Sequence, residues 1–125
     1  MDGRIYHLVS RLTGSLDHAW SIQEMADAVE LSVPHLRKLF KRNLGISPMA
    51  YLRERRLERA CECLENSFHQ LKQIGSQVGI TDCSRLSHDF KSRFGVSPTE
   101  YRRRYWDQMQ SGTLPISEMI VLYKN

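Results

Sequence analysis

Apolar residues recur along the chain at the spacing of one face of an α-helix. The first stripe consists of Ile5, Leu8, Val9 and Leu12, and it predicts a helix that ends near Gly14. Further stripes of the same period follow along the chain, whereas alternating β-branched runs joined by Asn-Gly or Asp-Gly turns are missing. The pattern therefore predicts an all-α fold.

Polar residues that accept hydrogen bonds from backbone N–H groups mark where several helices begin. Ser21 with Glu24, and Ser97 with Glu100, each form the Ser-x-x-Glu pattern of a capping box, in which the two side chains satisfy two free N–H groups reciprocally. Ser32 is expected to cap a helix of its own. These signals predict short helices in both halves of the chain.

The longest predicted helix lies in the middle of the chain. Gly45 suits the left-handed position just after a helix, and Ser47 with Pro48 supply an N-cap and a first residue for the next helix. An apolar face then continues until Asn66, so this helix would span roughly 27 Å at about 1.5 Å per residue. We expect it to act as a linker helix between two smaller helical units.

The order of apolar, glycine and proline positions is repeated in the second half of the chain. From Leu36 onward, the matching residue of the second half lies 50 positions later. Ahead of the turn it lies 49 positions later, because the second half carries one extra residue near Asp82. Two subdomains are therefore expected, over about 5–46 and 70–107, with the linker helix over about 48–66 between them. The pairs at one constant offset are Leu36 and Leu86, Phe40 and Phe90, Lys41 and Lys91, Gly45 and Gly95, Ser47 and Ser97, Pro48 and Pro98, Tyr51 and Tyr101, and Arg53 and Arg103.

The pattern in each half of the chain predicts two short helices joined by a tight turn. This arrangement is a helix-turn-helix, the unit that places its second helix in the major groove of DNA. A charged outer face on a single helix is more often merely solvated. Repetition favours DNA binding, because a stiff linker could set two such helices about 34 Å apart, the spacing of successive major grooves. The outward positions are Val33, Pro34, Arg37, Lys38 and Lys41 in the first half, and Cys83, Ser84, Arg85, Ser87, His88 and Lys91 in the second.

Composition and reactive residues narrow the classes of function. Lys and Arg number 18 against 14 Asp and Glu, a net charge of +4 that mildly favours a polyanionic partner. The chain has three cysteines, Cys61, Cys63 and Cys83, and an odd number cannot all pair in disulfides. The first two point to different sides of a helix, so neither a disulfide framework nor a metal site is expected. Ser84 and His88 lie one helical turn apart without a third orienting residue, so we expect no enzyme and no cofactor.

No apolar run approaches the roughly 20 residues needed to cross a bilayer, and the N-terminus lacks the apolar core of a signal peptide. The sequence therefore predicts a cytoplasmic protein that does not bind a membrane. Residues 111–125 are predicted to be a C-terminal extension, whose stretch from Ile116 to Tyr123 either docks as an added helix or remains mobile.

Two long phrases, SVPHLRKLFKRNLGISPMAYLRERRLERA and VGITDCSRLSHDFKSRFGVSPTEYRRRY, resemble the two halves of the DNA-binding domain of the AraC/XylS family. The resemblance covers roughly Ile5 to Trp106, where the last helix is expected to end. It implies seven helices in two subdomains joined by a long fourth helix, with the third and sixth helices in adjacent major grooves. Its most specific residues are Gly79, Phe90, Lys91, Phe94, Gly95, Ser97, Pro98, Tyr101 and Arg102.

The same resemblance implies which residues contact DNA. Backbone near Trp20, Ser21 and Ser32, and near Gln70 and Asp82, is expected to meet phosphates at helix N-termini. Arginine can bind guanine O6 and N7 with two hydrogen bonds, and lysine and serine can reach phosphates or bases. Base-facing roles fall on Pro34, Arg37 and Lys38 in the first half, and on Cys83, Ser84, Arg85, Ser87 and His88 in the second.

Two positions depart from the pattern that the resemblance implies. Asp89 occupies the position that Leu39 has in the first half. We expect Asp89 to pair with Arg85 or Arg93. An ion pair that occupies Arg85 would weaken the recognition of bases by this residue. Pro34 offers no donor, so apolar contact with a thymine methyl group is the contact left to it. Specificity in the first half would then depend on the basic residues of its second helix.

Residues 1–110 are thus expected to form the DNA-binding domain of a bacterial transcription regulator, with activation among its roles and double-stranded promoter DNA as its partner. The alternative is a protein-interaction or architectural module that contacts RNA polymerase and binds DNA only incidentally. Family members often carry a separate effector-sensing domain, and nothing in this chain resembles one. Both a stand-alone regulator and a fragment of a longer one are therefore compatible with the sequence.

Overall fold

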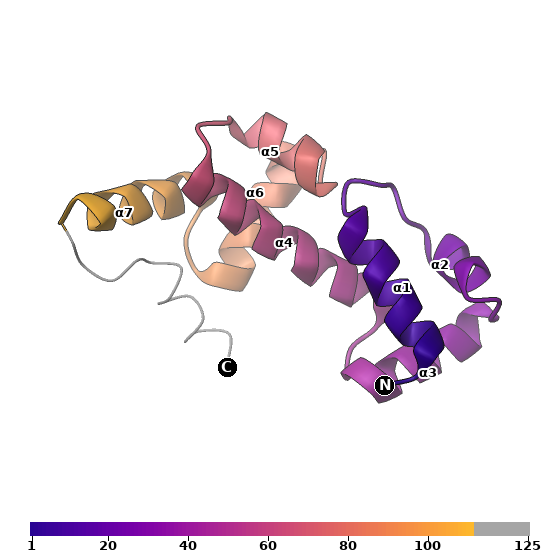
Figure 1. The fold of residues 1–125 in the computed structure, drawn as a ribbon. Coiled ribbons are helices and arrows are strands. Elements are labelled where there is room, and N and C mark those ends of the chain that lie inside the picture. Colours follow the sequence, from indigo (N-terminus) through magenta and orange to yellow (C-terminus); the bar gives the residue numbers. More distant parts are fainter. Residues whose placement is uncertain (112–125) are drawn as a thin grey trace. The chain divides into compact units, whose positions relative to one another are not determined.

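The computed structural model describes residues 1–111, which form α-helices and no strand (Figure 1). The predicted all-α fold is confirmed. The stretch from Ile116 to Tyr123, proposed above as an added helix or a mobile tail, lies outside the described residues. In the described part, no helix is long and apolar enough to cross a membrane. The helices are α1 (Gly3–Gly14), α2 (Ile22–Ala28), α3 (Val33–Leu44), α4 (Pro48–Asn66), α5 (Leu71–Val78), α6 (Cys83–Phe94) and α7 (Pro98–Ser111).

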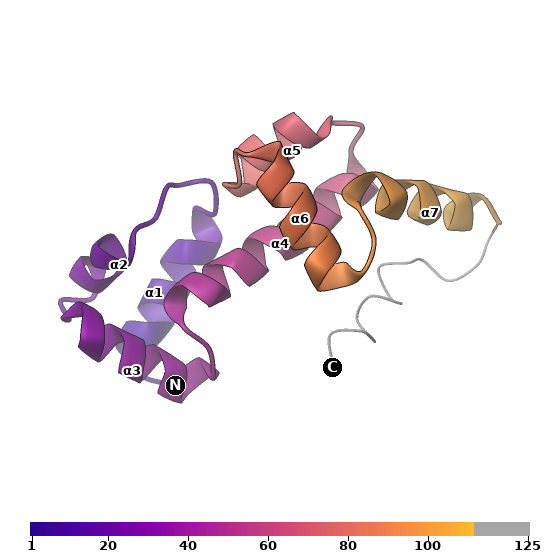
Figure 2. The same cartoon turned by 180° about the vertical axis from the view of Figure 1, so that it is seen from behind.

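The chain divides into two compact units, and the boundary falls inside α4. Unit 1 extends from Met1 to Arg56 and contains α1, α2, α3 and the first part of α4; unit 2 begins at Leu57. Seen from behind in Figure 2, the same order holds in each unit, with a short helix followed by a turn and a longer one. Each unit has its own hydrophobic core.

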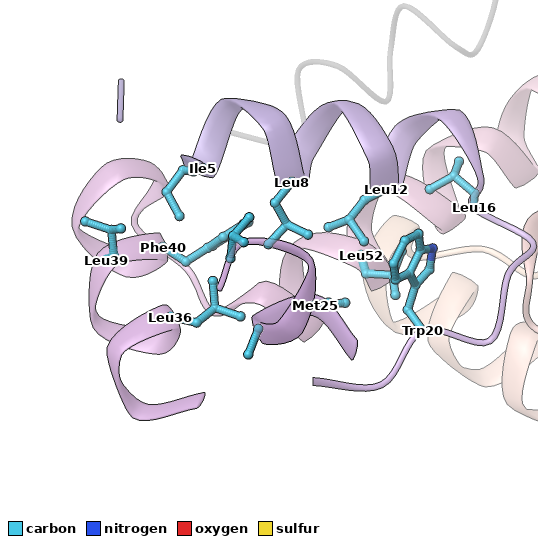
Figure 3. Close-up of a cluster of buried hydrophobic side chains, with 12 residues drawn as sticks. Ile5, Leu8, Leu12, Leu16, Trp20, Met25, Leu36, Leu39, Phe40 and Leu52 are labelled. Atoms are coloured by element: carbon cyan, nitrogen blue, oxygen red, sulfur yellow. The ribbon is translucent and has the colours of Figure 1, made fainter. Parts of the chain in front are cut away.

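The core of unit 1 is formed by the apolar stripes that the periodicity predicts. Figure 3 shows Ile5, Leu8 and Leu12 directed from α1 toward the side chains of α2 and α3. Phe40 of α3 is fully buried, and its ring packs edge-on against Tyr51 with 5.5 Å between ring centroids. The buried cluster consists of Ile5, Leu8, Leu12, Leu16, Trp20, Met25, Ala26, Val29, Leu36, Leu39, Phe40 and Leu52.

A partly buried polar pair adjoins the apolar residues in the core of unit 2. The fully buried Tyr101 of α7 donates a hydrogen bond from its hydroxyl to the carboxylate of Glu65 on α4. Burial raises the pKa of Glu65, and burial together with this hydrogen bond raises the pKa of Tyr101. The buried cluster consists of Leu57, Ala60, Cys61, Leu64, Ile74, Val78, Leu86, Phe90, Phe94 and Tyr101.

The two predicted capping boxes are only half formed. Ser21 Oγ accepts the N–H of Glu24 at 3.0 Å, and Ser97 Oγ accepts the N–H of Glu100 at 3.2 Å. In neither box does the glutamate carboxylate return to the serine N–H. That of Glu24 contacts Nε2 of His18 at 2.8 Å, and that of Glu100 is bound by arginines of its own helix. The prediction of reciprocal boxes is wrong, because other side chains occupy both carboxylates: the His18 imidazole at Glu24 and two guanidinium groups at Glu100.

Ion pairs follow one another along the exposed face of α7. Arg103 and Arg104 donate to the Glu100 carboxylate at 2.5 and 2.9 Å, and these hydrogen bonds lower the pKa of Glu100 to about 2. The predicted end of the last helix near Trp106 is wrong, because α7 continues to Ser111. Nη1 of Arg103 donates to Oδ2 of Asp107 at 3.3 Å, and a contact between residues four positions apart stabilises the helix beyond Trp106.

Two arginines fix the segments that lead into the helix-turn-helix of each unit. Arg56 and Arg102 are partly buried, and burial lowers the pKa of both guanidinium groups. Charged donors on several carbonyl oxygens hold a loop that has no regular hydrogen bonding of its own. Arg56 donates to the carbonyl oxygens of Leu16 (2.9 Å) and His18 (2.7 Å), and Arg102 donates to those of Leu64 (3.1 Å), Ser67 (3.1 Å) and His69 (2.7 Å).

The turn of each helix-turn-helix passes through a left-handed residue. This residue is Glu30 (φ 58°) between α2 and α3, and Gly79 (φ 89°) between α5 and α6. Glycine adopts this backbone region at no steric cost, whereas a glutamate there is uncommon. Both occupy the same position of the repeat, so the extra residue of the second half lies between Gly79 and Asp82, the N-cap of α6.

Gly75 lies inside α5 at a position where no side chain fits. A Cβ atom there would be 2.4 Å from the carbonyl oxygen of Ile80, a backbone atom that cannot rotate away. We expect Gly75→Ala to destabilise unit 2 by about 1–3 kcal/mol, because the overpacking outweighs the higher helix propensity of alanine. Thermal unfolding followed by circular dichroism measures the change.

Gly14 provides the matched control for this substitution. It is the last residue of α1, and a Cβ atom there would meet nothing within 4 Å. Gly14→Ala should therefore leave the unfolding midpoint unchanged or raise it slightly. A midpoint for Gly75→Ala that equals or exceeds that of the parent chain would show that α5 and its turn separate at little cost.

Candidate nucleic-acid interface

Helix α3 has a buried side and an exposed side. Ser32 caps its N-terminus by accepting the N–H of His35 at 3.3 Å, and Gly45 (φ 80°) ends it in the left-handed conformation. The proline in its first turn removes no intrahelical hydrogen bond. Leu36, Leu39 and Phe40 are buried in the core of unit 1. The residues predicted to face DNA, Pro34, Arg37, Lys38 and Lys41, are all exposed.

Two positions of α3 differ from the sequence-based assignment of faces. Val33 was expected to point outward, and it is instead half-buried against the core of unit 1. It lies three residues before Leu36, so both are on the same side of the helix. His35 was not predicted, and it is exposed in the first turn. The repeat could have found it, because His35 is the counterpart of Arg85.

The exposed side of α3 carries positive charge that nothing in its own unit neutralises. The helix VPHLRKLFKRNL contains Arg37, Lys38, Lys41 and Arg42 and no carboxylate. None of these four side chains forms an ion pair with any residue in the range 1–111. Free guanidinium and ammonium groups on one helix face are suited to bind phosphates and the acceptor atoms of base edges.

Helix α6 is built on the same plan but has an acidic N-cap. The carboxylate of Asp82 accepts the N–H groups of Ser84 at 2.9 Å and Arg85 at 3.1 Å. This carboxylate occupies the N–H groups that would otherwise be free at the helix N-terminus. Of the predicted site residues, Ser84, Arg85, His88 and Lys91 are exposed, and Cys83 and Ser87 are half-buried.

Asp89 pairs with Arg85 on the surface of α6, as the sequence led us to expect. Nε of Arg85 donates to Oδ2 of Asp89 at 3.2 Å, and Nδ1 of His88 lies 3.5 Å from the other carboxylate oxygen. The Asp89 side chain is 16% exposed, whereas that of Arg85 is 68% exposed. The outer face of α6 is therefore less positive than that of α3.

Other chemistries have little support in the described residues. No group of three or more His, Cys, Asp or Glu side chains in residues 1–111 is arranged to hold a metal ion. Cys61 is buried in the core of unit 2, and burial raises the pKa of the Cys63 thiol. A raised pKa lowers the fraction of reactive thiolate at neutral pH.

Two helix-turn-helix units of this kind, each with a polar outer face on its second helix, define a double helix-turn-helix domain. A family model described as a helix-turn-helix domain matches residues 25–104. The chain belongs to the AraC/XylS family of helix-turn-helix transcription regulators. The sequence-based assignment to this family is confirmed.

Curated relatives match over most of this chain. The lactose operon transcription activator of Staphylococcus xylosus is 33% identical over 101 residues, which cover 81% of this chain and 36% of that protein. The transcriptional activator RhaS of Escherichia fergusonii is 32% identical over 102 residues, which cover 82% of this chain and 37% of that protein. The chain thus spans about a third of the length of the curated relatives it matches.

Solved structures have the same fold. The DNA-binding domain of AdpA, determined in complex with a target DNA, matches with a TM-score of 0.83 at 20% identity, covering 86% of this chain and 96% of that one. A regulator from Chromobacterium violaceum with an AraC-type DNA-binding domain matches with a TM-score of 0.74 at 29% identity, covering 81% and 90%. The fold is therefore that of an AraC-type DNA-binding domain.

Proposed function

We propose that this chain binds double-stranded promoter DNA sequence-specifically, with α3 and α6 each in a major groove, and that it regulates transcription in the cytoplasm without catalysing a reaction. The observation that supports this most strongly is the row of exposed cations on α3, which pair with no acidic group among residues 1–111. A helix of this kind fits the width of the major groove of B-DNA. Because the named relatives are activators, we also propose activation as its role.

In the first unit we assign base reading mainly to Arg37. Its planar guanidinium can bind guanine O6 and N7 with two hydrogen bonds, whereas Lys38 and Lys41 act as point charges for bases and phosphates. Pro34 would make apolar contact, for example with a thymine methyl group. The helix N-termini at Ser21, Ser32 and Gln70, which have neutral caps, would bind phosphates through the N–H groups that their caps leave free.

In the second unit the exposed polar residues of α6 would contact bases, with Lys91 on a phosphate. Ser84, Arg85 and His88 are the exposed donors closest to the helix start, and Cys83 and Ser87 would add contacts at their edge. We do not extend the phosphate assignment to the N-terminus of α6, because the Asp82 carboxylate occupies its N–H groups and repels a phosphate.

Selection from a random pool of duplexes, followed by gel-shift competition, tests the proposed function. We expect enrichment of a long bipartite site, and we expect the selected duplex to compete far better than its scrambled version. Binding should also fall steeply as salt rises, because phosphate contacts release counterions. Equal competition by the scrambled duplex, or affinity that salt barely changes, would favour a module that binds RNA polymerase instead.

A further inference from the structure

Asp89 interrupts the apolar inner side of α6. Its counterpart in the repeat is Leu39, which belongs to the buried core of unit 1. The ion pair with Arg85 compensates poorly for the apolar contact that a leucine would make. An ion pair whose arginine is largely exposed to solvent contributes little to stability, and an arginine four residues before its acidic partner is the less favourable order in a helix. The pair therefore has a weak structural justification.

The geometry of the ion pair leaves the two terminal nitrogens of the Arg85 guanidinium available to bind a base. It is the Nε–H of Arg85 that reaches Asp89, at 3.2 Å. The remaining donors, on Nη1 and Nη2, form the fork that matches guanine O6 and N7. Arg85 is 68% exposed, so this fork is accessible to a DNA groove. The contact of His88 with the second carboxylate oxygen is longer, at 3.5 Å, and correspondingly weak.

We propose, building on the proposed function, that Asp89 is a positioning residue that holds Arg85 ready to recognise a guanine. A side chain that is already held loses fewer rotamers on binding, so more of its hydrogen-bond energy contributes to affinity for the correct base. The carboxylate also repels the phosphate backbone, which lowers binding to any sequence alike. On this proposal the ion pair sharpens base reading, whereas the sequence alone suggested that it would weaken it.

The test begins with the base that Arg85 reads. Duplex selection with the full chain and with Arg85→Ala identifies the guanine position that depends on Arg85, where we expect a preference of about tenfold. Asp89→Leu, which introduces the residue found at the equivalent position of unit 1, should reduce that preference to about threefold or less. The same variant should bind a scrambled duplex about two- to threefold more tightly, because a repelling charge is lost. Asp89→Glu should restore much of the preference, because it keeps the carboxylate.

Each other outcome has a distinct meaning. An unchanged or stronger guanine preference in Asp89→Leu overturns the proposal, since Asp89 would then be inert or would withhold Arg85 from DNA. If Arg85→Ala alters no position of the site while Arg37→Ala does, the proposal fails but the proposed function stands. If the parent chain enriches no sequence, the proposed function itself fails. Helical content and melting of Asp89→Leu and Asp89→Glu verify that lost preference does not reflect unfolding.

Discussion

Replacing Arg37, Lys38 and Lys41 together with glutamine is expected to lower affinity for the selected duplex about 100-fold or more. These three side chains are exposed on α3 and form no ion pair with any residue in the range 1–111, so no partner in that range competes with DNA for them. Fluorescence anisotropy titrations at several salt concentrations measure the effect. The slope of log affinity against log salt should also become shallower, by about 0.9 for each phosphate contact that is lost.

Three exposed arginines outside α3 provide a control with the same change of charge. Arg59, Arg103 and Arg104 are exposed but each is ion-paired within its own helix. Replacing these three with glutamine changes the net charge by the same amount, and we expect less than about a tenfold loss of affinity, because only the long-range field is altered. Equal losses for the two triple variants would mean that net charge, and not the face of α3, determines binding.

Phe90→Ala is expected to destabilise unit 2 by about 3–5 kcal/mol, the largest effect on folding that we predict. Phe90 is fully buried, and its ring packs against those of Phe94 and Tyr101 with centroid distances of 4.8 and 5.6 Å. Because whole domains are stable by only about 5–15 kcal/mol, a unit of this size would be largely unfolded. Amide hydrogen exchange resolved along the chain measures the loss separately in each unit.

Phe40→Ala is the matched variant in the other unit. Phe40 holds the equivalent position of the repeat, and the two buried clusters share no residue. We therefore expect faster exchange mainly in α1, α2 and α3 for Phe40→Ala, and mainly in α5, α6 and α7 for Phe90→Ala. If either substitution accelerated exchange throughout residues 1–111, the two cores would fold as one cooperative unit, and their assignment to separate units would not describe the energetics.

The helices and both cores could be predicted because burial imposes a helical period on the sequence. The stripe through Leu36 and Phe40, and its copy through Leu86 and Phe90, are buried as the spacing indicates. Helix ends were less predictable. The Glu24 carboxylate depends on His18, which lies outside the local capping pattern, and no local rule shows which partner it takes.

The candidate site was predictable in type and less so in detail. The exposed cations of α3 follow from the helical period, but a small error in the phase of the helix placed Val33 outside and overlooked His35. The pairing of Asp89 with Arg85 could be expected from their spacing, but the sequence does not say which nitrogen of Arg85 it occupies. The carbonyl contacts of Arg102 join residues far apart in sequence, so no local pattern announces them.

The separation of inner and outer residues on α3 and α6 also bears on how such a chain can evolve. Core residues and exposed donors are distinct sets on each helix, so most substitutions on the outer face should alter stability by less than about 0.5 kcal/mol. On the proposed function, a substitution on the outer face of one helix should therefore change the base preference of that half-site and leave the cores of both units intact. Variants with a new base preference can then accumulate one substitution at a time, because most single steps on the outer face keep the chain folded.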